Sequence, residues 1–293
     1  GAAVAYLALC TILGFTHCLC AMNIVQTSTV SSGPTPLERK EALLFLQAHL
    51  PDMDREHISP LYLARNVELA LQARYATPWA LAVPWDIFLN DVVPHASLDE
   101  PREEWRAMMA GRFSPLVAGA SSLSEAALAL NQQIWGIWGI VFKPDHTPEI
   151  MSPSQVIAAG YASCTGLSIF LVDACRAVGI PARVAGTPSW VMDRRGPNDR
   201  FNNHNWVEIW DGKGWSFMGA AEYDARGLNR TWFFPSPVKH QVPGGGLNAV
   251  YATTYRPLPD GPAFPLVWHL DYRGVHGVDV TTNYINADVQ PDS

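Results

Sequence analysis

The chain has 293 residues, 48% of them hydrophobic and 16% charged, which is an ordinary globular composition with enough length to bury a core. Acidic residues outnumber basic ones by 27 to 20, so the formal net charge is −7. Lys and Arg nowhere form a stripe that could follow a phosphate backbone. Nucleic acid is therefore excluded as an expected partner.

The start of the chain has the pattern of an exported protein. Residues 2–21 are mostly apolar and end in small residues, and the apolar run is shorter than the roughly 20 residues of a membrane span. We expect a signal peptide over residues 1–21, a polar linker over 22–36, and a chain that is secreted or lies in the secretory-pathway lumen. No stable membrane insertion is expected after signal cleavage, and an uncleaved signal-anchor is the alternative. An N-glycosylation acceptor pattern at Asn229 agrees with this route.

From residue 37 the chain divides into three regions by pattern. Residues 37–142 carry apolar repeats of helical spacing, which begin after a capping box at Thr35. Residues 143–235 contain a second capping box at Ser152, a helix with two cysteines, and three strand-like segments. Residues 236–293 are rich in Pro, Gly and β-forming residues and predict a β-rich extension. The expected fold class is α+β, with a helix packed on a small antiparallel sheet after a mainly helical region.

Outside the leader the chain has two cysteines, Cys164 and Cys175, which excludes a disulfide-dense scaffold. On one helix they lie about 16 Å apart, whereas a disulfide needs Cα atoms within about 7 Å. Cys175 lies three turns into the helix, among apolar neighbours, and is expected to be part of the core. Cys164 lies in the first turn, where free N–H groups and the positive end of the helix dipole favour a thiolate.

A nucleophilic cysteine needs a base held on a rigid element, and His204 is the candidate. It begins the strand-like segment HNWVEIW, residues 204–210, which precedes the turn DGKG. Alternation along this segment puts His204, Trp206 and Glu208 on one face. Glu208 lies too far along the strand to reach His204 and is expected to be solvated surface.

The segments SCTGLSIFLVDACRAVGIPARVAG and HNWVEIWDGKGW together resemble the core motif of the transglutaminase-like, papain-like superfamily of cysteine enzymes. Residues 83–105 also resemble the helical lead-in of one subgroup. The resemblance implies a catalytic core over residues 143–235, with a papain-like helix packed on an antiparallel sheet. It also implies a catalytic triad of Cys164, His204 and an Asp or Asn.

The third residue departs from the family pattern. The family places its Asp in a Gly-Trp-x-x-x-Asp pattern, and this chain has Gly219 at that position. We expect Glu222 to be the third catalytic residue, because its longer side chain and closer position need the smaller shift. Asp224 is the alternative, and a backbone carbonyl or the amide of Asn205 are further ones.

These residues predict acyl transfer, in which His204 deprotonates Cys164 and the thiolate attacks a carbonyl to form a thioester. Gln155 and Trp190 are candidates for the oxyanion site or the cleft wall. The expected substrate is a peptide, a protein or a small amide, resolved by water in a peptidase or amidase, or by an amine in a transamidating enzyme. We favour hydrolysis because water needs no dedicated second site.

Two other hypotheses stay open at this stage. A catalytically degenerate transglutaminase-like binding module would explain the missing Asp, although such a module has no reason to keep both Cys164 and His204. A metal-dependent enzyme would have to use the histidines and aspartate of the tail, which match no ligand motif: His240, His269, Asp271 and His276. We therefore expect neither a metal nor a cofactor. No pattern specifies an oligomeric state.

Overall fold

The structure is a computed structural model, and it describes residues 33–144, 148–191 and 202–289. The chain divides into two units, Gly1–Ser32 and Gly33–Ser293, of which the second is described here. The predicted signal peptide and most of the predicted linker lie outside the described residues. The three regions predicted from the sequence, residues 37–142, 143–235 and 236–293, all belong to the second unit.

Helices occupy the first part of this unit, as the sequence predicts. The expected capping box is present at the first helix, where the Thr35 side chain accepts the N–H of Glu38 and the Glu38 carboxylate accepts the N–H of Thr35. The hydroxyls of Ser59, Thr77 and Ser122 cap three of the later helices. The helices are α1 (Pro36–Ala48), α2 (Pro60–Ala76), α3 (Pro78–Leu81), α4 (Trp85–Asp91), α5 (Trp105–Val117) and α6 (Leu123–Trp138), with a 3₁₀ turn η1 (Asp52–Asp54).

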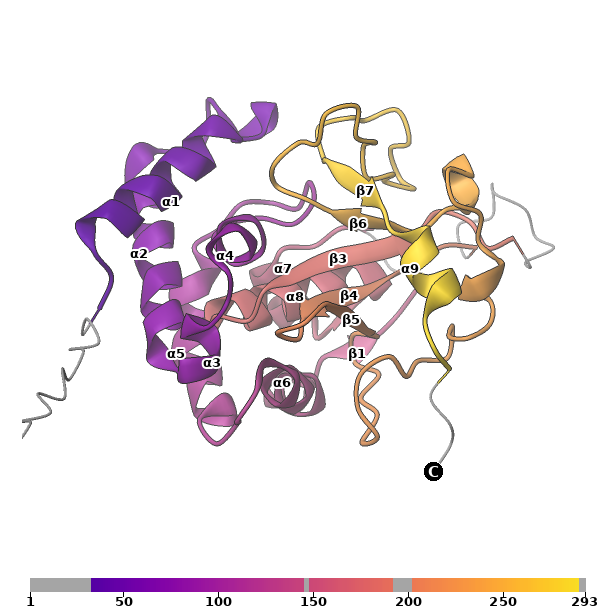
Figure 1. The fold of residues 1–293 in the computed structure, drawn as a ribbon, viewed down its shortest axis with the longest axis horizontal. Helices are drawn as coiled ribbons and strands as arrows, with labels where there is room; N and C mark the ends of the chain where they lie inside the picture. The colour runs from indigo at the N-terminus through magenta and orange to yellow at the C-terminus, as the bar shows by residue number, and fades with distance from the viewer. Residues whose placement is uncertain (1–32, 145–147, 192–201, 290–293) are drawn as a thin grey trace, which may run out of the picture. The chain divides into compact units, whose positions relative to one another are not determined.

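The central helix is α8 (Cys164–Ala177), and every residue of it after Cys164 is buried. It follows α7 (Pro153–Ala159) and a short parallel pair formed by β1 (Val141–Phe142) and β2 (Tyr161–Ala162). Gly166 in its first turn allows close packing, because a Cβ there would lie 2.8 Å from the Cβ of Ala162. Figure 1 shows α8 behind strands β3 and β4, which it contacts.

The main sheet has five antiparallel strands in the order β5-β4-β3-β6-β7, so the α+β prediction is confirmed. The three strands predicted from the sequence lie side by side, and the region after residue 235 adds two more. The sheet therefore draws on both the predicted core and the predicted extension. Its strands are β3 (Ala182–Thr187), β4 (His204–Trp210), β5 (Trp215–Met218), β6 (Tyr251–Thr253) and β7 (Gly277–Asp279), followed by α9 (Thr281–Asn286); the 3₁₀ turns η2 (Val238–His240) and η3 (Gly246–Asn248) precede β6.

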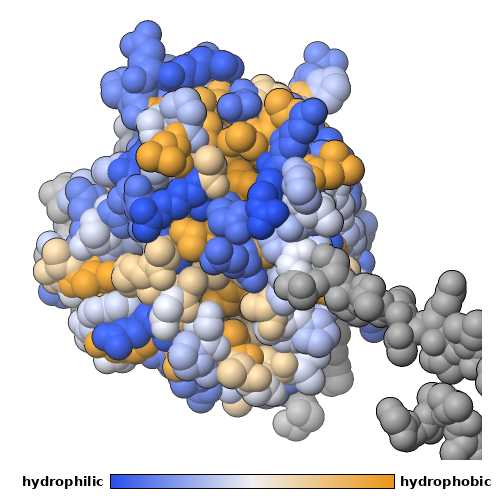
Figure 2. All heavy atoms as spheres, turned by 90° about the vertical axis from the view of Figure 1, so that its left-hand side faces the viewer, coloured by the Kyte–Doolittle hydropathy of each residue, from blue (hydrophilic) through white to orange (hydrophobic). Residues whose placement is uncertain are grey.

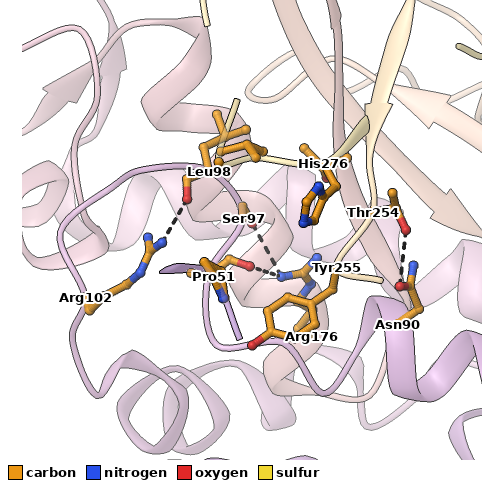
Figure 3. A pocket seen from close by; sticks show the side chains of 13 residues that line it. Pro51, Asn90, Ser97, Leu98, Arg102, Arg176, Thr254, Tyr255 and His276 are labelled. Atoms are coloured by element: carbon orange, nitrogen blue, oxygen red, sulfur yellow. Dashed lines mark hydrogen bonds between the residues drawn. The ribbon is translucent and has the colours of Figure 1, made fainter. Parts of the chain in front are cut away.

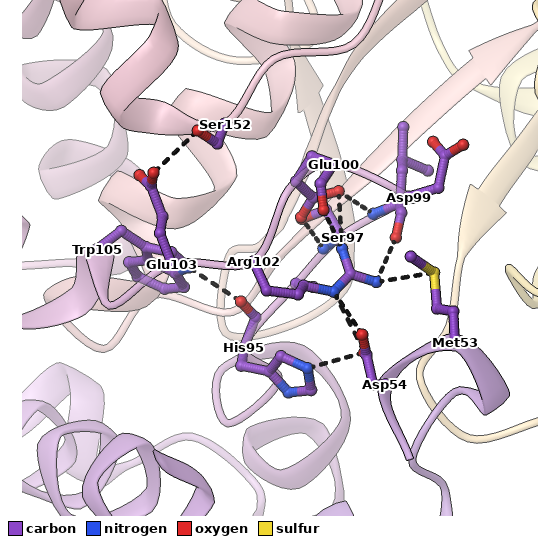
Figure 4. A network of polar contacts seen from close by, with 12 residues as sticks. Met53, Asp54, His95, Ser97, Asp99, Glu100, Arg102, Glu103, Trp105 and Ser152 are labelled. Atoms are coloured by element: carbon purple, nitrogen blue, oxygen red, sulfur yellow. Dashed lines mark hydrogen bonds and ion pairs between the residues drawn. The ribbon is translucent and has the colours of Figure 1, made fainter. Parts of the chain in front are cut away.

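The helical region is joined to α8 by buried polar groups. The guanidinium of Arg106 on α5 donates to the carbonyl of Arg176 at 2.9 Å and to the side chain of Asn66 at 2.9 Å. Figure 4 shows a neighbouring network in which buried Asp54 contacts His95 and Arg102. Since buried charges are tolerated only with partners, the helical region is a structural part of this unit.

Glu103 continues this network to the start of α7. Its carboxylate accepts a hydrogen bond from the hydroxyl of Ser152 at 2.9 Å (Figure 4). It also accepts one from the backbone N–H of Ser154 at 2.8 Å. The helical region therefore fixes the N-terminus of α7.

The expectation that Glu208 is solvated was wrong. Glu208 is buried, and its carboxylate accepts hydrogen bonds from the guanidinium of Arg183 and the hydroxyl of Tyr284, each at 2.7 Å. Arg183 lies directly opposite Glu208 on β3, and Tyr284 comes from α9. The face of β4 that carries Glu208 is covered because α9 packs there, a contact that the local strand pattern does not encode.

The surface over the first helices mixes polar and apolar side chains. Figure 2 shows hydrophobic residues scattered among hydrophilic ones on this face. Single exposed apolar residues such as Leu37, Leu44 and Leu61 are normal on the surface of a globular fold. Among the helices of the described residues, none combines the length and apolar character needed to cross a bilayer.

Candidate active site

Cys164 is the first residue of α8, as the sequence predicts. The Ser163 hydroxyl caps the helix by accepting the N–H of Gly166. Because Cys164 occupies the first helical position, its own N–H has no acceptor within the helix. The thiol is half-buried, whereas Cys175 is fully buried in the core.

The first turn of α8 is tied to the first residues of β4. The side-chain amide of Asn205 donates to the Thr165 hydroxyl at 2.8 Å, and the backbone N–H of Asn205 donates to the Cys164 sulfur. The Asn205 carboxamide fits because residue 186 on β3 is Gly, where a Cβ would lie 2.0 Å from its oxygen. This tie brings the Cys164 sulfur to the residue that follows His204.

His204 begins β4 and lies among aromatic rings. Its ring centroid is 5.8 Å from that of Trp206, 5.3 Å from Phe233 and 5.0 Å from Trp232. Its Nε2 atom has no hydrogen-bond partner among the described residues and lies 3.9 Å from Oε1 of Glu222. That separation is within ion-pair range and about 1 Å longer than a hydrogen bond.

The Glu222 carboxylate lies over Gly219, the position that lacks the family's Asp. A Cβ built on Gly219 would lie 1.9 Å from Oε2 of Glu222 and 2.4 Å from its carboxyl carbon. Gly219 follows β5 in the register that pairs Met218 with Val207, so a side chain at 219 would share the face of Trp206 and His204. The carboxylate of Glu222 thus fills the space into which an Asp side chain at residue 219 would project.

Trp232 holds this carboxylate from the solvent side. Its indole N–H donates to Oε1 of Glu222 at 3.0 Å, and its side chain is largely exposed. Trp232 was not among the predicted site residues, although the run of aromatic residues at 232–234 indicates a packed cluster.

Burial determines the protonation states of the resting site. Burial raises the pKa of Cys164 above its usual range, and the hydrogen bonds from Asn205 and Thr165 lower it only in part. Burial lowers the pKa of His204 to about 3 and raises the pKa of Glu222. At neutral pH the Cys164 thiol and the His204 imidazole are therefore both neutral, rather than a thiolate and an imidazolium.

The sequence model of the transglutaminase-like superfamily matches residues 112–220, which include α8, β3, β4 and β5. These residues form a transglutaminase-like superfamily domain. The predicted resemblance is thereby confirmed.

Two solved structures are similar to this chain. One, from Cytophaga hutchinsonii and provisionally named a cysteine protease, is 17% identical with a TM-score of 0.36, and the match covers 52% of this chain and 47% of that chain. The other is the periplasmic domain of TgpA from Pseudomonas aeruginosa bound to ethylmercury, 21% identical with a TM-score of 0.31, covering 41% of this chain and 46% of that chain. The chain spans just under half the length of each. No curated protein matched it.

Two further predicted residues, Asp224 and Asn229, make contacts away from His204. Asp224 pairs with Arg226 at 2.6 Å, and this contact lowers the pKa of Asp224 to about 2. It is Glu222 that lies beside His204. Asn229 uses its carboxamide to bind the N–H of Phe217 at 2.8 Å, so its side chain is engaged with the end of β5.

Among the described residues, no hydrogen bond joins either oxyanion candidate, Gln155 or Trp190, to Cys164. The Gln155 carboxamide oxygen accepts the N–H of Ser152 in the predicted capping box of α7. The Trp190 ring is buried and stacks on Trp206 and Phe233, with centroids 6.1 and 6.2 Å apart. These contacts place Gln155 in the cap of α7 and Trp190 in the aromatic cluster around His204.

A pocket at the other end of α8 is separate from this site. Figure 3 shows Arg176, Tyr255 and His276 around it, and its cavity of about 30 Å³ has room for about two water molecules. Arg176 and Cys164 lie about 18 Å apart along the helix. Among the described residues, no three His, Cys, Asp or Glu side chains are close enough to hold a metal ion, and the four tail residues named above form no such group.

Proposed function

We propose that this chain is a cysteine-dependent acyl-transfer enzyme that hydrolyses a peptide-like amide, with Cys164 as nucleophile, His204 as base and Glu222 as the residue that orients His204. The observation that carries the proposal is the position of the Glu222 carboxylate over Gly219 and 3.9 Å from His204. A carboxylate at this point favours the imidazolium that forms when His204 takes a proton.

The steps of the reaction follow from the neutral resting pair. His204 takes the thiol proton as the Cys164 sulfur bonds to the carbonyl carbon of the amide. His204 then gives this proton to the departing nitrogen as the C–N bond breaks, which leaves a thioester on Cys164. Water attacks the thioester with its proton taken by His204, and the acid product leaves as the thiol is restored.

The negative oxygen of each tetrahedral intermediate needs a donor. The backbone N–H of Cys164 is suited to this role because it has no acceptor within α8 and lies at the positive end of the helix. The expected localisation, secreted or in the secretory-pathway lumen, remains part of the proposal and rests on the apolar leader.

A fluorogenic peptide-amide library tests the proposal. We expect Cys164→Ala to abolish turnover and Cys175→Ala to retain it, because Cys164 is partly exposed and hydrogen-bonded to Asn205, next to His204, whereas Cys175 is buried. His204→Asn should lose at least a hundredfold in kcat/KM, as is typical for a missing general base. Turnover that survives Cys164→Ala would contradict the proposal, and hydroxylamine added as an acceptor would reveal transamidation by forming a hydroxamate.

A further inference from the structure

The carboxylate of Glu222 reaches its place through a tight turn after β5. The N–H of Glu222 donates to the carbonyl of Gly219 at 3.2 Å, and Ala221 between them has a φ of 61°. This left-handed conformation is unfavourable for a residue with a Cβ, and such residues persist where their surroundings fix them. Some other part of the molecule must therefore hold this turn.

Asn131 on α6 forms hydrogen bonds with the backbone of this turn. Its side-chain N–H donates to the carbonyl of Gly219 at 2.8 Å, and its side-chain oxygen accepts the N–H of Ala221 at 3.0 Å. Asn131 is itself fully buried, and the indole of Trp135, one turn along α6, donates to both its backbone and side-chain oxygens. The carboxamide is thus fixed in orientation, and its two hydrogen bonds span Ala220, from the carbonyl of Gly219 to the N–H of Ala221.

We propose that Asn131 is a positioning residue that sets where the Glu222 carboxylate lies relative to His204. This inference rests on the proposed function, because it gives Asn131 a role in the reactivity of Cys164 through Glu222 and His204. No other described side chain bonds to the backbone of residues 219–221, so Asn131 is the side-chain support of the turn backbone, while Trp232 bonds to the carboxylate itself. An Asp at residue 219 would extend directly from the strand end and would need less of this support.

The test measures the rate at which iodoacetamide modifies Cys164 from pH 6 to pH 10, with the modified residue identified by mass spectrometry. Asn131→Ala should lower the rate at pH 7 about fivefold, because a displaced carboxylate no longer supports proton transfer to His204. The rates should converge at high pH, where the thiol ionises without help. If Asn131→Ala does not fold, Asn131→Asp keeps the acceptor for Ala221 and should give a smaller loss of the same form.

Asn66→Ala is the matched control. Asn66 is also a buried helical Asn whose side-chain N–H donates to a backbone carbonyl, that of Val93 at 2.7 Å, but it lies in the helical region. Its replacement should lower stability without changing the pH profile of Cys164. A general loosening of the structure would instead raise the alkylation rate at every pH, since a more exposed sulfur reacts faster.

A second background separates the proposed role of Asn131 from that of Glu222. In Gly219→Asp/Glu222→Ala the carboxylate comes from the strand end, so adding Asn131→Ala should slow Cys164 less than it does in the natural chain. An equal loss in both backgrounds, or no loss in Asn131→Ala while Glu222→Ala is slow, would overturn the role of Asn131 alone. No change in Glu222→Ala would overturn the proposed role of Glu222.

Discussion

Moving the carboxylate between residues 222 and 219 is the sharpest perturbation that the site offers. Glu222→Ala removes the carboxylate that lies over Gly219, and Gly219→Asp brings one back from the strand end. Gly219 has no left-handed φ, so its backbone accepts a side chain. With Glu222 in place, however, the new Cβ would lie 1.9 Å from its Oε2 atom, so the single variant Gly219→Asp must displace the natural carboxylate.

The size of the effect follows from the distance between His204 and Glu222. Opposite unit charges separated by 3.9 Å attract by about 4 kcal/mol at an effective dielectric constant near 20. The Glu222 side chain is 32% exposed, and solvent screening reduces this to about 1–2 kcal/mol. Since 1.4 kcal/mol is a factor of ten, Glu222→Ala should slow steps that protonate His204 by about 5- to 30-fold.

The assay compares four chains by iodoacetamide modification of Cys164 at pH 7 and by peptide-amide turnover. Glu222→Ala should be slow, Gly219→Asp should be intermediate because two carboxylates compete for one space, and the double variant should return to within about threefold of the natural chain. Additive losses in the double variant would refute the idea that Glu222 does the work of an Asp at residue 219. All four chains should unfold cooperatively, which is checked by circular dichroism.

Three further predictions concern stability. The folded-state pKa of His204 is about 3 against an ordinary 6.5, so its contribution to stability is present above pH 6.5 and is lost as the pH falls. Between pH 6.5 and 4.5, the free energy of unfolding measured in urea should therefore fall by about 2 kcal/mol less in His204→Asn than in the natural chain. An equal fall in both chains would contradict the assignment. Glu208→Ala leaves the Arg183 guanidinium buried without its carboxylate and should lower the free energy of unfolding by about 3–5 kcal/mol. Tyr284→Phe removes only a hydroxyl and should lower it by about 1 kcal/mol. Similar values for the two variants would argue against the buried pair. A chain that starts at Ser114 lacks Arg106 and the network around Asp54, and it should show no cooperative thermal transition; a sharp transition would mean that the helical region is dispensable.

Local signals in the sequence were enough to predict the elements that carry the candidate nucleophile and base. The capping boxes at Thr35 and Ser152 are present, and the segments 204–210 and 215–218 match β4 and β5. These features depend on residues within a few positions of one another, where capping and alternation act.

The parts that sequence analysis missed depend on contacts between distant segments. The burial of Glu208 needs Tyr284 from α9, and the turn that carries Glu222 needs Asn131 from α6. Ala221 gives no local sign of a left-handed conformation, because Gly or Asn is the usual residue there. The choice of Glu222 over Asp224 rested on reach alone, and it is the Arg226 contact that directs Asp224 elsewhere.

Trapping the acyl-enzyme tests the central claim most directly. After brief reaction with p-nitrophenyl acetate and acid quenching, peptide mapping by mass spectrometry should find an acetyl thioester on Cys164, none on Cys175, and a strongly reduced amount on Cys164 in His204→Asn. An unmodified Cys164, or equal acetylation of Cys164 in the natural chain and in His204→Asn, would contradict the account.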